Sequence, residues 1–137
     1  MKPLMKILAV ALVAGAFSAA AFAASPAQQE AATALEHADF AAQANQVATV
    51  HLHLHHVVNC LVGEHGKQFY APAGDPCKGM GRGAIYDVGA HTALKARLEK
   101  VLVMAERGLT ENKLENARAS ALHVKQMLKQ VLATMKK

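Results

Sequence analysis

Residues 91–136 read HTALKARLEKVLVMAERGLTENKLENARASALHVKQMLKQVLATMK, and their apolar side chains recur at every third or fourth position. Such spacing places the apolar side chains on one face of an α-helix. Gly108 is expected to end a first helix as a left-handed cap, and Thr110 is expected to cap a second. The segment therefore predicts a helical hairpin with two apolar stripes: Leu94, Leu98, Val101 and Ala105, then Leu114, Ala117, Ala121, Val124, Leu128, Val131 and Met135.

Residues 27–62 also show helical spacing and contain neither Gly nor Pro. Two observations favour a break within them. The apolar stripe that begins at Leu35 is out of phase with the one that begins at Val47. A weak internal repeat at an offset of 67 positions also aligns residues 44–46 with the turn that begins at Gly108. Two helices are therefore predicted here, and one helix of 36 residues is the alternative.

Residues 63–90 lie between these two segments and hold seven of the nine Gly and two of the four Pro. This composition predicts one long Gly-rich loop. The predicted fold is all-α: an up-and-down four-helix bundle of two helical hairpins joined by this loop, within a single domain spanning residues 24–137. A three-helix bundle with a long first helix is the alternative.

The composition agrees with an all-α fold. Hydrophobic residues make up 53% of the 137 positions, yet the chain has only four Phe, two Tyr and no Trp. A β-sandwich would require more β-branched and aromatic residues. The chain length and the two Cys also argue against a multidomain enzyme and against a disulfide-dense miniprotein.

Residues 1–23 are predicted to be a secretory signal peptide. Lys2 and Lys6 precede an apolar run of 11 residues, and Ala21-Phe22-Ala23 forms an A-x-A cleavage site. The apolar run is too short to span a bilayer, and no later segment is apolar enough for membrane insertion. We therefore expect export to the periplasm, with cleavage after Ala23.

Charge is distributed unevenly along the chain. No Lys or Arg occurs from Ala24 to Gly66, although most of the eight His lie in this stretch, and such a surface permits a bound cation. Residues 91–137 are basic, which makes an acidic protein partner possible. Their charges alternate with Glu residues, however, which favours a solvated helix surface. The few aromatic residues argue against binding to nucleic acid.

Four His lie within six residues, at His51, His53, His55 and His56. On a helix they divide between the two flanks of the apolar stripe. His53 and His56 share one flank with Cys60, and His51 and His55 share the other with Asn59. Residues three or four positions apart have Cβ atoms about 5–6 Å apart, so two such imidazoles can share a metal ion.

This cluster predicts a site for a divalent metal ion, with His53 and His56 as the primary pair and His51 and His55 as a weaker second site. Met80 or His65 is expected to provide a further ligand from the loop. The stability order for nitrogen ligands favours copper over nickel and zinc. The scattered residues His37, His65 and His91 are expected to be solvated unless the fold gathers them.

The two Cys are expected to pair. In an exported chain a Cys60–Cys77 disulfide is the favoured interpretation, because exported proteins fold in an oxidising compartment. The alternative is that Cys60 is a thiolate ligand for copper.

Motifs for common enzyme chemistries are absent from the sequence, including C-x-x-C-H, H-E-x-x-H and G-x-S-x-G. The chain is therefore predicted to be non-enzymatic. Two other functions remain open. One is a structural or interaction module of the periplasm, in which the His cluster is only a solvated helix surface. The other is a bundle that binds haem non-covalently through a His–Met pair.

The run His53-Leu54-His55-His56-Val57-Val58-Asn59-Cys60-Leu61-Val62-Gly63, followed by Pro76-Cys77-Lys78-Gly79-Met80-Gly81, resembles a group of small exported helical proteins of proteobacteria. That resemblance implies export and the pairing of the two Cys, and it implies no activity. In its His content and expected bundle the chain is also similar to small periplasmic metal-binding four-helix proteins. It differs from their dispersed-His pattern because its His are concentrated on one helix.

Overall fold

A computed structural model describes residues 23–136, and every regular element in that range is a helix. The all-α prediction is therefore confirmed. The predicted signal peptide lies outside the described residues, apart from Ala23. Within residues 23–136 no helix is both long and apolar enough to cross a membrane.

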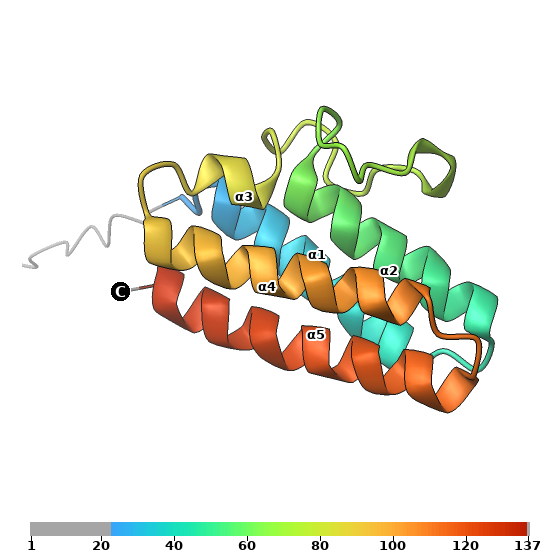
Figure 1. The fold of residues 1–137 in the computed structure, drawn as a ribbon. Helices are drawn as coiled ribbons and strands as arrows, with labels where there is room; N and C mark the ends of the chain where they lie inside the picture. Colours follow the sequence, from blue (N-terminus) through green and yellow to red (C-terminus); the bar gives the residue numbers. More distant parts are fainter. Residues whose placement is uncertain (1–22, 137) are drawn as a thin grey trace, which may run out of the picture.

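Four long helices form the body of the molecule: α1 (Pro26–Gln43), α2 (Val47–Val62), α4 (Thr92–Leu109) and α5 (Leu114–Met135). They lie side by side, with α1 against α2 and α5, and α4 against α5 and α2 (Figure 1). The predicted break at residues 44–46 is confirmed, so the alternative of one long first helix is wrong. Ser25 begins α1 with a capping box, in which it exchanges hydrogen bonds with Gln28.

The helices contribute side chains of different sizes to the core. α1 contributes mainly alanines, whereas its neighbours contribute Leu and Val. The apolar stripes predicted for α4 and α5 are confirmed, since their central residues are buried and Leu94, Leu114 and Met135 pack at the edges of the core. Because the buried face of α1 consists of alanine methyl groups except at Glu30, α1 can approach its neighbours closely. The fully buried alanines of α1 are Ala31, Ala34, Ala38 and Ala41.

The turn between α4 and α5 is built differently from the sequence prediction. Gly108 is not a left-handed cap, because it lies inside α4 and has no positive φ. A Cβ atom at Gly108 would lie 2.6 Å from Cδ1 of Leu54 and 3.0 Å from Cβ of Ser120, so glycine allows close packing of three helices. Thr110 follows α4 and donates a hydrogen bond to the carbonyl of Arg107 (2.8 Å), instead of capping α5.

The connection from α2 to α4 is more ordered than the single long loop that its glycines predict. It contains the 3₁₀ turn η1 (Ala71–Ala73) and the short helix α3 (Ala84–Asp87), which packs against α1, α2 and α4. The reason is apolar burial, because Ala84 and Val88 are part of the core.

Two devices attach this connection to α2. The predicted Cys60–Cys77 disulfide is present, with Cα atoms 5.3 Å apart, so Cys60 is not a thiolate ligand. The buried amide of Asn59 donates to the carbonyls of Tyr70 (3.0 Å) and Gly74 (2.7 Å) and accepts from the backbone N–H of Tyr70 (2.8 Å). These bonds fix the segment that contains η1 against the side of α2.

Candidate metal centre

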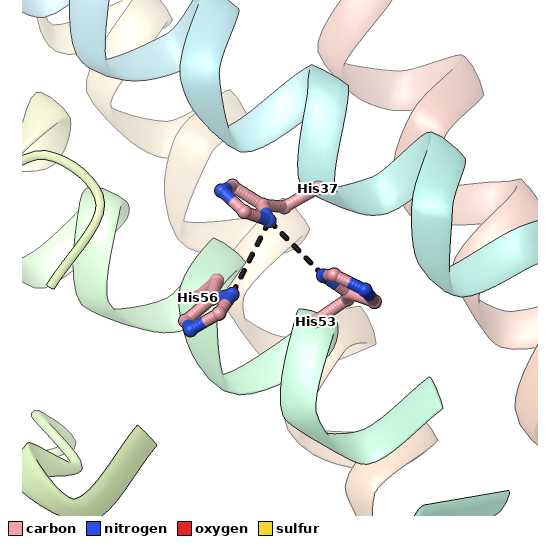
Figure 2. A group of neighbouring side chains, drawn as sticks. All are labelled: His37, His53 and His56. Atoms are coloured by element: carbon pink, nitrogen blue, oxygen red, sulfur yellow. Dashed lines mark hydrogen bonds between the residues drawn. The ribbon is translucent and has the colours of Figure 1, made fainter. Parts of the chain in front are cut away.

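Three histidines from two helices converge at the surface between α1 and α2. His37 extends from α1 toward His53 and His56 of α2 (Figure 2). The Nδ1 atom of His37 lies 3.1 Å from Nδ1 of His53 and 3.2 Å from Nδ1 of His56. All three side chains are half-buried, and their ligand atoms lie within 4.8 Å of one another. We refer to these three residues as the histidine cluster.

The spacing of the nitrogens suits a single metal ion. Two nitrogens bound to one tetrahedral zinc ion at about 2.0–2.1 Å lie roughly 3.3 Å apart. The two contacts of His37 Nδ1, at 3.1 and 3.2 Å, are close to this separation. A metal ion therefore requires only small side-chain movements on the His37 side of the cluster.

A backbone carbonyl orients His56. Nε2 of His56 lies 2.7 Å from the carbonyl oxygen of Ala73 in η1, and because a carbonyl can only accept, Nε2 must carry the proton. In a neutral imidazole this leaves a lone pair on Nδ1, which faces His37. Metal-bound histidines are commonly held in this way by a carbonyl or carboxylate on the other ring nitrogen.

Burial favours the uncharged forms of His37 and His53. The pKa of His37 is lowered to about 4, first by burial and then by the charges that His56 and His53 carry when they are protonated. The pKa of His53 is also lowered, first by burial and then by His56. Because a metal ion binds neutral imidazole, these shifts keep two of the three nitrogens available at neutral pH. Phe40 covers one side, with its ring centroid 5.7 Å from that of His37 and 5.3 Å from that of His53.

The other two histidines of the sequence cluster have separate partners. Nε2 of His51 lies 3.0 Å from the carbonyl oxygen of Glu111, at the turn before α5. His55 stacks on Tyr70 with ring centroids 4.2 Å apart, and burial lowers its pKa. Neither residue belongs to the group of close ligand atoms that contains His53 and His56.

The loop residues expected as further ligands also lie in other surroundings. The sulfur of Met80 accepts a hydrogen bond from Thr33 (3.6 Å), one helical turn before His37. His65 is exposed beside Glu64, 3.5 Å away. His123 lies on the α4–α5 face, in a groove that it lines with Met104 and Met127.

His37, the third member of the histidine cluster, was expected from the sequence to be solvated unless the fold gathers the scattered His. One signal in the sequence could have identified it. His37 lies eight residues before Asn45, and His53 lies eight residues after it. A helical hairpin that turns at Asn45 therefore brings the two positions to the same level.

No protein-family model, curated protein or solved structure matches this chain. Function therefore has to be inferred from the geometry of the cluster. Three imidazoles that face one another can bind a divalent metal ion through their unprotonated nitrogens and leave a further coordination position for water or another ligand.

Proposed function

We propose that this protein is a non-enzymatic periplasmic metal-binding protein that buffers or carries a late first-row divalent ion, copper being favoured over nickel and zinc. The convergence of the Nδ1 atoms of His37, His53 and His56 carries the proposal. The scaffold is interpreted as an up-and-down four-helix bundle, with the site on its first hairpin.

Hydrogen bonding alone accounts poorly for the two short contacts of His37. The lone pair of His56 faces Nδ1 of His37, so that contact requires a proton on His37. The same proton would then have to be shared with Nδ1 of His53, at 3.1 Å. A metal ion, in contrast, accepts all three lone pairs at once. The absence of Lys and Arg between residues 24 and 66 also removes nearby positive charge in the sequence.

The choice of copper rests on the donor set. A site made of imidazole nitrogens binds Cu²⁺ more tightly than Ni²⁺ or Zn²⁺ when geometry does not override the stability order. The periplasmic location is supported by the predicted signal peptide, and the Cys60–Cys77 disulfide fits an oxidising compartment.

The test is isothermal titration calorimetry with Cu²⁺, Ni²⁺ and Zn²⁺. Substitution His37→Ala should weaken copper binding by roughly 100-fold or more, because it removes a ligand and not only an outer hydrogen bond. His53→Ala and His56→Ala should have effects of similar size. His123→Ala is the matched control, since His123 is exposed on α5 and should leave the affinity unchanged.

Equal copper affinity in the wild type and His37→Ala would refute a three-histidine site. If the double variant His51→Ala/His55→Ala also bound equally, the His would be surface and packing residues, and a structural module would become the leading proposal. Native mass spectrometry of the chain purified from the periplasm would report both its location and its bound metal.

A further inference from the structure

A second group of polar residues surrounds Glu30 of α1. Glu30 is only 1% exposed, two helical turns before His37. One carboxylate oxygen, Oε1, accepts a hydrogen bond from the backbone N–H of Gly83 (2.8 Å). The other, Oε2, is buried and has no hydrogen-bond partner within residues 23–136. A buried carboxylate oxygen without a partner is costly and requires an explanation.

Glu30 lines a cavity of about 270 Å³ between α1, the end of α2 and the connection that follows it. The carboxylates of Glu64 and Asp75 line the same cavity, and Lys78 is the only Lys or Arg among its lining residues. We refer to this cavity as the carboxylate pocket.

A further carboxylate lies beside the pocket. Asp87 is close enough to Glu30 for a side-chain hydrogen bond when one of the two carboxyl groups is protonated. Its charge is paired with Nε of Arg82 (3.4 Å), and its Oδ2 also accepts from the backbone N–H of Arg82 (2.7 Å). A Cβ atom on Gly81 would overlap Asp87 and lie 2.8 Å from Oε1 of Glu30. The backbone thus passes close to both carboxylates, and a larger residue at this position would displace them.

The charge of Glu30 is not compensated by the chain. Its pKa is raised to about 7, first by burial and then by the negative charges of Asp87 and Asp75 and a hydrogen bond with the side chain of Asp87, while the N–H of Gly83 lowers it. Above neutral pH the pocket therefore contains a buried anion that a cation would stabilise.

We infer that the carboxylate pocket binds a hard divalent cation, Ca²⁺, with Oε2 of Glu30 as its buried anchor. The carboxylates of Asp75 and Glu64 line the same pocket and are the further oxygen donors, but they are not gathered into a compact ligand group in the structure and must move toward the ion. Oxygen ligands select hard cations, whereas the nitrogens of the histidine cluster select late transition metals. Ca²⁺ is favoured over Mg²⁺ because it tolerates an irregular set of oxygen ligands, whereas Mg²⁺ demands nearly octahedral geometry.

The probe is Ca²⁺ alone, added to the full chain at pH 8 and followed by thermal unfolding and calorimetry. A site of this kind should have a Kd on the order of 10⁻⁴ M. A Ca²⁺ concentration about 100-fold above the Kd should then raise the melting temperature by roughly 10 °C. Glu30→Gln should weaken binding at least tenfold, because it keeps the shape and removes the charge. Glu36→Gln, an exposed residue on the same helix, is the matched control and should respond as the wild type does.

Asp75→Asn provides a second variant, because asparagine can still accept the hydrogen bond from the N–H of Cys77. It should also weaken Ca²⁺ binding. The inference is overturned if Ca²⁺ leaves the melting temperature of the wild type unchanged, or if it stabilises Glu30→Gln by the same amount. A null result with Ca²⁺ would mean that Glu30 instead holds a proton shared with Asp87. An equal or larger response to Mg²⁺ would overturn the choice of Ca²⁺.

Discussion

The histidine cluster and the carboxylate pocket both depend on α1, and burial affects them in opposite ways. It lowers the pKa of His37 to about 4 and raises that of Glu30 to about 7. The physical cause is the same, since a low-dielectric environment disfavours whichever form is charged. His37 becomes neutral by losing a proton and exposes a lone pair, whereas Glu30 becomes neutral by gaining one. At neutral pH the first site is therefore ready for a metal ion, and the second must exchange a proton for a cation.

The largest expected effect concerns Glu30. Its pKa is higher in the folded chain than in the unfolded one, so the folded state binds more protons between pH 4.5 and about 7. Without divalent cations, the free energy of unfolding should therefore fall as the pH rises through this range. A shift from 4.5 to about 7 corresponds to about 3 kcal/mol, at 1.36 kcal/mol per unit.

Urea unfolding in a chelating buffer at pH 4.5 and pH 8 checks this prediction. Glu30→Gln should be more stable than the wild type at pH 8 by up to that amount, and the two should converge at low pH. Parallel stability curves for the two proteins would show that Glu30 does not titrate as its burial requires.

Removing the disulfide should weaken Ca²⁺ binding at the carboxylate pocket more than copper binding at the histidine cluster. Cys60→Ala/Cys77→Ala should lower the free energy of unfolding by roughly 3 kcal/mol, the value for a loop of this length. Ca²⁺ binding should be lost, because Cys77 lines the carboxylate pocket. Copper affinity should fall only about tenfold, since the disulfide acts on His56 indirectly through the carbonyl of Ala73. A greater loss of copper binding than of Ca²⁺ binding would contradict this arrangement.

The acid limb of the stability curve, in which the free energy of unfolding falls as the pH falls below 6.5, tests the histidine cluster. The pKa of His37 is lower in the folded chain, so its contribution to stability is complete above pH 6.5 and is lost as the pH falls toward 4. Since His37 is partly exposed, we expect a loss of about 2 kcal/mol, less than the full shift implies. His37→Leu should flatten this limb in metal-free urea titrations, while His123→Gln should leave it unchanged. His53 and His55 should still give His37→Leu some acid sensitivity, because their pKa values are lowered too.

The smallest expected effect distinguishes a packing histidine from a ligand. His51→Ala removes one hydrogen bond to the carbonyl of Glu111 and should lower the free energy of unfolding by about 1 kcal/mol. Copper affinity should not change. A drop in affinity comparable to that of His37→Ala would place His51 in the metal site and contradict the geometry.

Much of this fold follows from local patterns in the sequence. The apolar stripes of α4 and α5, with a residue at every third or fourth position, identify the buried faces of these helices. The stripe that begins at Leu35 is out of phase with the stripe that begins at Val47, and this difference indicates the break before α2. Because the chain has a predicted export signal, its two Cys are expected to form a disulfide. His53 and His56 can be selected as a pair because their spacing puts them on the same side of one helix, which is a property of local geometry.

Other features were decided by contacts between distant segments. His37 became part of the cluster because the methyl-lined face of α1 packs against α2, and Gly108 was placed inside α4 by the close approach of Leu54. Glu30 looks like an ordinary helix-surface acid in the sequence, and only the return of the connection at Gly83 buries it. Helical periodicity shows which residues share a face. The tertiary structure decides what covers that face, and that covering determines solvation, pKa and the set of ligands.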